Sequence, residues 1–416
     1  MTPRTAKAIF ILGGHQTDFA RNYAKEGLEI SDIVRDAIEG TLHDAHLDAD
    51  WIETIHVGNA FGQLFNGQGQ LGGMPATVEP KLWGVPAARH EAACASGGIA
   101  VLAAMAEIEA GRYDCALVLG AEQERNVPGD QATRHLGAAA WVGHEGEDAK
   151  FMWPFMFSQL ADEYDKRYGL DPRHLSAIAE LNFRNAKSNP NAQTRGWTHT
   201  PNSFMADDVA NPVVEGRVRR SDCSQVTDGG AGLVLAGRQT AERWAGLHHV
   251  DLDQVPRIIG WGHRTVGLPY AEKVRRSAKD EYVLPHVRRT ITDAFARAGI
   301  ADVTGIDGIE THDCFTPSEY MAIDHFGITP AGKSWQAIEE RTLERDGATP
   351  VNPSGGLIGG GHPVGATGVR MLVDAARQVS GAAGATQVEG ARIFATLNIG
   401  GSTTTTVSFV VASNVG

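Results

Sequence analysis

Cysteine is scarce in this sequence, because only four of its 416 residues are cysteines: Cys94, Cys115, Cys223 and Cys314. None belongs to a CxxC pair, and their density is far below that of a disulfide-stabilised secreted protein. We therefore expect reduced thiols. The wide spacing of the cysteines and the scatter of the 16 histidines form no zinc-binding pattern, so we predict no metal site.

Positive charge is also in deficit, because 37 Lys and Arg residues face 50 Asp and Glu residues and leave a net charge of −13. This balance disfavours binding to nucleic acid or to anionic lipid. No apolar run approaches the roughly 20 residues that a membrane span needs. We expect no nucleic-acid partner, no membrane span, and a cytoplasmic or organelle-matrix location.

The composition that remains is that of an ordinary globular protein, 42% apolar and 21% charged, and the length suits a large enzyme of two or three packed units. The apolar run 116–120 predicts a strand buried on both faces, and the Ala-rich segment 99–108 before it predicts a helix. The same order recurs late in the chain, with a helix predicted over 369–378 and a strand over 393–397. This recurrence indicates an internal duplication into two α/β halves, each with a parallel sheet.

Residues 123–225 interrupt this pattern with clustered aromatics and polar loops, which indicates an inserted cap over the two halves. The apolar run 231–236 then predicts the last strand of the first half. We therefore divide the chain into a first half (1–122 and 226–250), a loop domain (123–225) and a second half (251–416).

Two segments carry the strongest chemical signals. Cys94 lies among small residues before the first predicted helix, where the helix dipole would lower the pKa of a thiol and favour the thiolate; a buried structural cysteine is the alternative. His362 lies in segment 352–368, in which seven of seventeen residues are glycines that permit close approach of a large ligand. A phosphate-binding loop is disfavoured there, because its lysine and the ribose-binding acid of a first βαβ unit are absent.

Two weaker signals lie in the second half. His312 and Cys314, two residues apart after the strand-like run 306–309, are expected to project in the same direction. The segment 396–402 runs from a strand into glycines, whose backbone N–H groups could donate to an oxyanion.

Together these motifs resemble the thiolase superfamily over nearly the whole chain. Cys94-Ala95-Ser96 matches its CxS nucleophile motif, and Gly361-His362-Pro363 matches its GHP motif within the long signature 352–368. His312-Asp313-Cys314-Phe315 is similar to the sterol-carrier-protein-type thiolases. At the place of the family's second catalytic cysteine this chain has Asn398-Ile399-Gly400, as those members do. In that subtype the cysteine of the HDCF motif is thought to supply the acid/base group instead.

The resemblance implies an α/β thiolase fold, in which two repeated βαβαβαββ halves form a five-layered αβαβα arrangement and the inserted loop domain embraces coenzyme A. It also implies cleavage of a 3-oxoacyl-CoA by CoA to acetyl-CoA or propionyl-CoA and a shortened acyl-CoA, as in fatty-acid β-oxidation, or the reverse Claisen condensation. CoA is then a substrate, no cofactor is bound permanently, and a homodimer or homotetramer is expected.

The resemblance further assigns roles to individual residues. Cys94 would carry the acyl group after His362 removes its proton. His312 and His362 would hold the enolate oxygen while Cys314 protonates the enolate carbon. The backbone N–H groups of Cys94 and Gly400 would form a second oxyanion hole.

Several alternatives and side expectations stay open. The chain could be a condensing acyltransferase or a carbon–carbon lyase of the same fold, working with a separate acyl-CoA-binding partner protein, or a non-catalytic CoA or lipid carrier. Cys115 and Cys223 are expected in the core. An arginine cluster at 217–220 could meet CoA phosphates or simply be a solvated surface.

Overall fold

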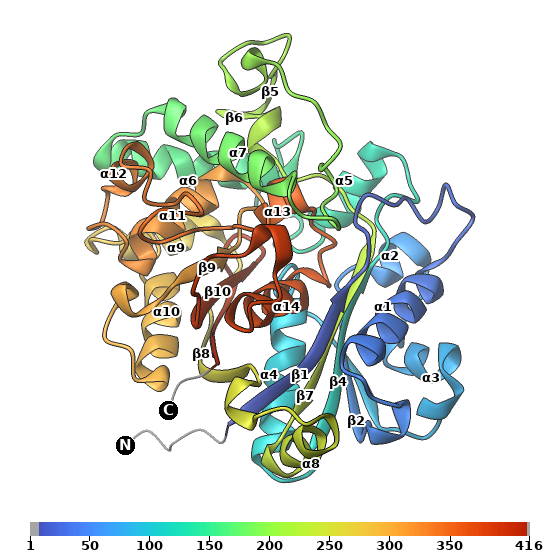
Figure 1. Ribbon diagram of the computed structural model, residues 1–416. Coiled ribbons are helices and arrows are strands. Elements are labelled where there is room, and N and C mark those ends of the chain that lie inside the picture. Colours follow the sequence, from blue (N-terminus) through green and yellow to red (C-terminus); the bar gives the residue numbers. More distant parts are fainter. Residues whose placement is uncertain (1–7, 414–416) are drawn as a thin grey trace.

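The computed structural model describes residues 8–413, which form a nine-stranded mixed sheet in the order β3-β2-β4-β7-β1-β8-β11-β10-β9 (Figure 1). The strands of the first half are β1 (Ile9–Gln16), β2 (Thr54–Gly58), β3 (Ala87–His90), β4 (Cys115–Glu122) and β7 (Gly229–Ala236). Those of the second half are β8 (Arg257–Thr265), β9 (Gly308–Thr311), β10 (Ile393–Gly400) and β11 (Thr405–Ala412). A short antiparallel pairing of β1 with β8 joins the halves.

The strand pattern of the first half recurs in the second. In each half the first strand pairs antiparallel with the last, and the last pairs antiparallel with the one before it (β1·β7 and β7·β4; β8·β11 and β11·β10). The strand before the last, β4 or β10, pairs in parallel with the second strand of its half, β2 or β9. The third strand is β3 in the first half, and in the second a single parallel bridge between Ile309 and Val351 takes its place. Each half of the sheet is therefore mixed, because its last strand is antiparallel to both of its neighbours. The expectation of a parallel sheet in each half was wrong.

The helices form layers on and between the two halves of the sheet. One apolar cluster joins α4 (Ser96–Glu109) and α14 (Thr367–Val379) to strands of both halves, so these two helices make the central layer. The outer faces are covered by α1 (Ile30–Asp44) and α8 (Arg238–His248) on the first half, and by α10 (Pro285–Ala298) and α11 (Thr316–Phe326) on the second. This is the five-layered arrangement that the resemblance implied.

Small residues let the central helices approach one another closely. A Cβ atom at Gly97, in the first turn of α4, would lie 2.8 Å from the carbonyl oxygen of Gly365, just before α14. Glycine at 97 thus permits a backbone contact that a side chain would block. The N-terminal ends of α4 and α14, which carry the two strongest sequence motifs, are held side by side.

The segment between β4 and β7 lies over one end of this core (Figure 1). It contains α5 (Gly129–Gly137), α6 (Met152–Tyr168), α7 (Pro172–Ala186), β5 (Val213–Glu215) and β6 (Val218–Arg219). Aromatic residues of α6 pack against the cluster that contains α10 and α11. The remaining helices are short: α2 (Gly62–Asn66), α3 (Met74–Val78), α9 (Tyr270–Ser277), α12 (Ser334–Glu339) and α13 (Gly356–Gly360).

No helix among the described residues is long and apolar enough to cross a membrane.

Candidate active site

Cys94 lies on a tight turn that leads into α4. Ala93 has a φ of 51°, in the left-handed region that non-glycine residues rarely adopt. The Ser96 hydroxyl braces the turn, because it accepts a hydrogen bond from the Ala92 N–H at 2.9 Å and donates one to the Ala93 carbonyl at 2.6 Å. The serine of the CxS motif therefore holds the backbone that presents the Cys94 thiol.

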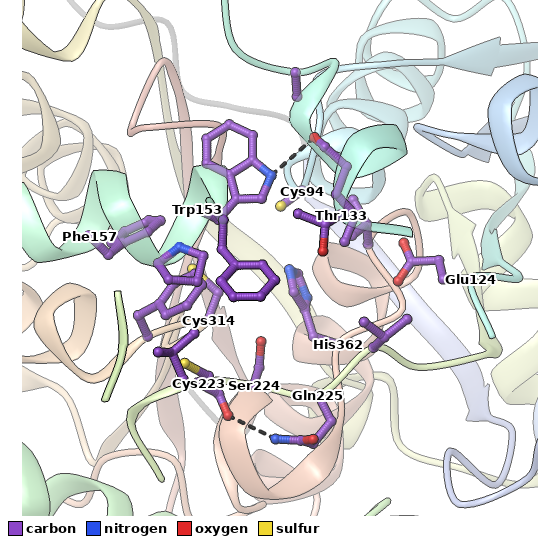
Figure 2. A pocket seen from close by; sticks show the side chains of 18 of the residues that line it. Cys94, Glu124, Thr133, Trp153, Phe157, Cys223, Ser224, Gln225, Cys314 and His362 are labelled. Atoms are coloured by element: carbon purple, nitrogen blue, oxygen red, sulfur yellow. Dashed lines mark hydrogen bonds between the residues drawn. The ribbon is translucent and has the colours of Figure 1, made fainter. Parts of the chain in front are cut away.

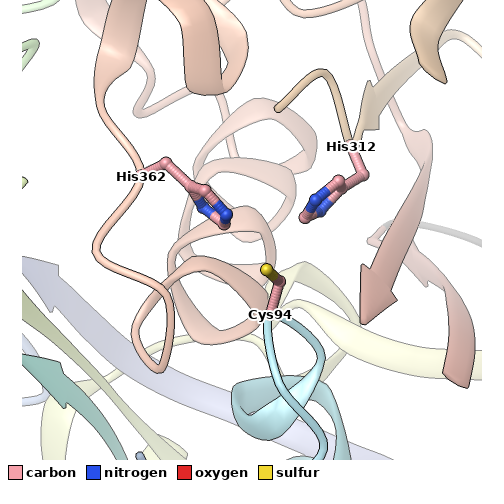
Figure 3. Close-up of side chains that lie close together, drawn as sticks. All are labelled: Cys94, His312 and His362. Atoms are coloured by element: carbon pink, nitrogen blue, oxygen red, sulfur yellow. The ribbon is translucent and has the colours of Figure 1, made fainter. Parts of the chain in front are cut away.

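Cys94, His312 and His362 come together although they are far apart in sequence. The cysteine sulfur and one nitrogen of each ring all lie within 4.8 Å of one another. The two imidazole rings are nearly perpendicular, with centroids 5.1 Å apart, and the thiol points into the gap between them (Figure 3). Both histidines are buried.

The hydrogen bonds of His362 determine which of its nitrogens is free to accept a proton. Thr367 Oγ1 lies 2.6 Å from His362 Nδ1 and donates its own proton to the Pro363 carbonyl at 3.1 Å. The threonine oxygen must therefore accept from Nδ1–H, which leaves Nε2 with a lone pair. That Nε2 is buried and has no hydrogen-bond partner among the described residues. His362 is thus poised as a base for Cys94.

In His312 the proton lies on the other ring nitrogen. The Asn398 Nδ2 amide donates to the Cys94 carbonyl at 2.9 Å and lies 3.4 Å from His312 Nδ1. Since an amide nitrogen can only donate, His312 Nδ1 accepts and the proton of the ring resides on Nε2. One histidine therefore offers a lone pair and the other an N–H donor.

Buried carboxylates hold the glycine-rich segment that carries His362. Asp313 accepts hydrogen bonds from the Leu357 and Ile358 N–H groups at 2.6 and 3.1 Å. Glu319 accepts from the side-chain amide of Asn352 at 2.7 Å. The acidic residues around Cys314 thus have a structural role, which fixes the segment 352–361 against β9.

Electrostatics leaves the Cys94–His362 pair uncharged. Burial raises the pKa of the Cys94 thiol to about 12, and the nearby Glu124 carboxyl adds to this rise. Burial lowers the pKa of His362 to about 3, with the Arg370 guanidinium adding to the effect. The expectation of a lowered pKa for Cys94 was wrong, because desolvation raises this pKa by more than the backbone N–H groups of Gly401 and Cys94 lower it. Proton transfer must instead accompany nucleophilic attack.

A neutral pair predicts a specific pH dependence for alkylation of Cys94 by iodoacetamide. The thiolate fraction of a group with a pKa of about 12 rises about tenfold per pH unit throughout the neutral and mildly alkaline range. Mass spectrometry of the Cys94 peptide should show this rise between about pH 7 and 9 without levelling off. A plateau with a midpoint near neutrality would instead reveal a thiolate–imidazolium pair.

The thiol opens into a cavity of about 310 Å³ whose wall is mostly apolar (Figure 2). Its lining includes Phe61, Leu136, Trp153, Phe157 and Val364. The cavity is lined by the inserted segment and by the loops that precede α4 and α14, which contribute Cys94 and Val364, so an acyl chain bound there would touch all three regions.

Cys314 also lines this cavity, although its sulfur is not part of the compact group made by Cys94 and the two histidines. Burial raises the pKa of the Cys314 thiol well above its usual value, and the proximity of Cys94 adds to this rise. Cys314 therefore keeps its proton and suits the role of an acid. Cys115 is buried in β4, as expected. Cys223 was expected in the core, but it is only half-buried and forms part of the cavity wall. An isolated antiparallel bridge pairs it with Phe315, which lines the same cavity.

The compact group of Cys94, His312 and His362 has the ligand types and the spacing that a metal ion could use. The absence of a metal site therefore remains a prediction from the sequence.

Two arginines of the cluster 217–220 form ion pairs at the surface. Arg217 pairs with Asp162 at 2.7 Å, and Arg219 pairs with Asp208 at 2.9 Å. Arg220 lies in the cavity lining.

Comparison with known proteins identifies the family. The thiolase N-terminal domain model matches residues 9–195, and a thiolase C-terminal domain-like model matches residues 271–413. An acetyl-CoA acetyltransferase from Methanothermobacter thermautotrophicus is 30% identical over 400 residues, which cover 95% of this chain and 96% of that protein. The chain belongs to the thiolase family.

Two further comparisons show a related sequence and a shared fold. Sterol carrier protein 2 of Homo sapiens is 25% identical over 415 residues, which cover 96% of this chain and 71% of that protein. The solved structure of an Ltp2-ChsH2(DUF35) aldolase shares the fold, with a TM-score of 0.76, 18% identity and 99% of each chain covered. The predicted thiolase fold and acyltransferase class are confirmed.

The glycine-rich end of β10 packs against the nucleophile turn of this thiolase fold. A Cβ at Gly400 would lie 2.1 Å from the Ala92 carbonyl oxygen, so only glycine permits this approach. The N–H groups of Cys94 and Gly401 act to lower the pKa of the thiol. Gly401, one residue beyond the predicted Gly400, is therefore a backbone donor that the sequence motif did not single out.

Sequence reasoning missed two further groups in the thiolase site. Thr367, which orients His362, lies within the signature 352–368 and could have been found as the hydroxyl residue five positions after the histidine. Glu124 lines the cavity but carries no motif, and nothing in the sequence signals it.

Proposed function

We propose that this chain is a thiolase that cleaves a 3-oxoacyl-CoA with CoA, or runs the reverse Claisen condensation, through an acyl group on Cys94. One observation carries the proposal. The Cys94 sulfur lies near the rings of His362, whose Nε2 has no hydrogen-bond partner among residues 8–413, and of His312, whose Nδ1 accepts and whose proton is therefore on Nε2. Acyl transfer with carbon–carbon cleavage needs these three functions together.

The first step forms the acyl-enzyme. His362 Nε2 takes the Cys94 proton as the sulfur attacks the 3-oxo carbonyl carbon, because both partners start uncharged. The carbonyl oxygen becomes an oxyanion, and we assign its stabilisation to the backbone N–H groups of Cys94 and Gly400, with Gly401 beside them.

Collapse of this intermediate breaks the bond between C2 and C3. The electron pair passes into the thioester as an enolate, whose oxygen would accept from the His312 Nε2–H and from the now protonated His362. Cys314 donates its proton to C2, and acetyl-CoA or its homologue leaves. The Cys314 thiolate then takes the proton of a second CoA thiol, whose sulfur attacks the acyl-Cys94 carbonyl. The Cys94–acyl bond breaks, the shortened acyl-CoA leaves, and Cys94 regains its proton from His362.

The direct test is thiolysis of acetoacetyl-CoA and of a long-chain 3-oxoacyl-CoA, each with free CoA, followed by loss of the 3-oxo thioester. Cleavage of either substrate supports the proposal and begins to define the chain length. If neither is cleaved and no acyl-enzyme forms, a carrier role replaces it.

Replacing Cys314 with alanine separates the two halves of the reaction. We expect acylation of Cys94 by an acyl-CoA to persist, because Cys94 and His362 are untouched. Carbon–carbon cleavage should fall by about 10²- to 10⁴-fold, the usual contribution of a general acid. Unchanged cleavage would show that another group protonates the enolate.

A lyase activity on the same fold is the second candidate, because the Ltp2-ChsH2(DUF35) structure that shares this fold is an aldolase. Cys94 favours the transferase, since a lyase needs no acylated thiol. That aldolase is named as a pair, Ltp2 with ChsH2(DUF35). We propose that this chain likewise works with a separate acyl-CoA-binding partner protein.

Assembly and location are also proposed. Edge strand β3 exposes Ala87 and Ala88, and its unpaired side could join a second copy into the homodimer or homotetramer expected of the family. We retain the division into two halves and a CoA-embracing loop domain (123–225), a cytoplasmic location, and fatty-acid β-oxidation as the setting.

A further inference from the structure

Glu124 is a buried carboxyl in the cavity wall that the mechanism above does not use. It follows β4 by two residues, is 1% exposed, and lines the same cavity as Cys94 and His362. Figure 2 shows its carboxyl group directed toward the space in front of His362 and Thr133. A polar group in this position faces whatever occupies the cavity.

The carboxyl of Glu124 has no cation to pair with. No ion pair involves it within residues 8–413, and its Oε1 atom has no hydrogen-bond partner there. The charged groups that act on it most strongly are two other carboxyls, Glu122 and Asp228. A buried, unpartnered polar atom is costly, and a ligand in the cavity that Glu124 lines can supply the missing partner.

The two neighbouring carboxyls accept most of their stabilisation from nearby hydrogen-bond donors, whereas the backbone N–H groups of Val364 and Thr227 serve Glu124. Asp228 accepts three backbone N–H groups, those of Tyr23, Glu124 and Arg125, at 2.8 to 3.0 Å. Glu122 accepts from the Asn59 side-chain amide at 2.8 Å and from the N–H groups of residues 60, 61 and 365.

Glu124 is therefore the member of this cluster that holds a proton. Burial, followed by repulsion from Glu122 and Asp228, raises the pKa of Glu124 well above its usual value, although the Val364 and Thr227 N–H groups oppose the rise. A neutral carboxyl can both donate and accept a hydrogen bond.

The surrounding wall is apolar, formed by side chains such as Phe61, Leu136 and Val364. A purely hydrocarbon acyl chain would fill this space but leave the Oε1 atom of Glu124 without a hydrogen-bond partner. Sites built around a buried polar group discriminate strongly against ligands that cannot hydrogen-bond to it. The substrate that fits both features is apolar overall but carries an oxygen near the reacting carbon.

We propose that Glu124 is a specificity residue that hydrogen-bonds a hydroxyl or carbonyl group on the acyl chain within a few bonds of the carbon attacked by Cys94. Preferred substrates are then 3-oxoacyl-CoA thioesters with an oxygen substituent on the acyl chain. This inference rests on the proposed thiolase reaction and defines its substrate class.

The test compares kcat/KM for 3-oxohexanoyl-CoA with that for its analogues carrying a hydroxyl at C4, C5 or C6. We expect the intact enzyme to prefer one of these analogues by at least about tenfold. Glu124→Gln, which keeps the shape and both hydrogen-bonding functions, should retain most of the preference. Glu124→Leu should abolish it by gaining activity on the plain substrate and losing it on the hydroxylated one. An exposed carboxyl on α1 provides the matched control, Glu39→Gln, which should change neither value.

Two outcomes overturn the proposal, and they are distinguishable. Cleavage of all four thioesters without preference, or a preference that Glu124→Leu leaves intact, contradicts the role of Glu124 alone. Failure of the intact enzyme to cleave any of them contradicts the thiolase reaction on which the role rests.

Discussion

Cys94→Ala is expected to lower the rate of thiolysis by a factor on the order of 10⁴ or more, because the variant cannot form the covalent intermediate that divides the reaction into two easier steps. The side chain is small and half-buried, so the loss should not come from unfolding. Steady-state thiolysis of a 3-oxoacyl-CoA, together with the thermal unfolding midpoint of the variant, measures both quantities.

Cys115→Ala is the matched control for this substitution. Cys115 is a thiol in β4, buried in the apolar cluster under α1 and away from the cavity. Its replacement should leave turnover within a few-fold of the intact enzyme, at a modest cost in stability. If Cys94→Ala retains a similar share of activity, the nucleophile has been assigned wrongly.

His362→Ala is expected to lower kcat by about 10²- to 10⁴-fold and, unlike Cys314→Ala, to slow the acylation of Cys94 as well. A thiol with a pKa of about 12 is almost entirely protonated at neutral pH, so it depends on a neighbouring base when it attacks. We propose that His362 Nε2, which lies near the Cys94 sulfur, is that base and that its ring donates to the enolate after it has taken the proton. Single-turnover acylation of Cys94 should slow together with overall turnover.

Thr367→Val distinguishes the basicity of His362 from its mere presence. This variant keeps the ring but removes the acceptor that holds the proton on Nδ1. A smaller loss than that of His362→Ala is expected, because the ring then divides its proton between two nitrogens. Full activity in His362→Ala would contradict the role of the base.

The sequence predicted the parts of the site that short motifs carry. Cys94, His312 and His362 were selected from their local patterns, and the structure brings them together. The helices and strands around them were placed correctly but too short: the helix predicted over 99–108 is α4 (Ser96–Glu109), because glycines and serine at its start hid the first turn. Local pattern thus located three residues that lie together in the fold, and their roles in the reaction stay predictions.

What the sequence could not show depends on contacts between distant segments. The pKa of Cys94 was expected to fall but is raised, since enclosure by other parts of the chain outweighs the local helix. Cys223 was assigned to the core because its neighbours in sequence do not reveal the cavity beside it. Glu124 follows an ordinary buried strand, and only the fold shows that it lines the cavity and that its Oε1 atom has no hydrogen-bond partner among residues 8–413.

Mass spectrometry of the intact enzyme and its peptides after brief incubation with acetoacetyl-CoA, in the absence of free CoA, tests the central claim most directly. We predict an acetyl group on the Cys94 peptide, its removal on addition of CoA, and no adduct on the peptides of Cys115, Cys223 or Cys314. An acetyl group on another cysteine, or thiolysis that proceeds without any acylated Cys94, would contradict the acyl-Cys94 mechanism.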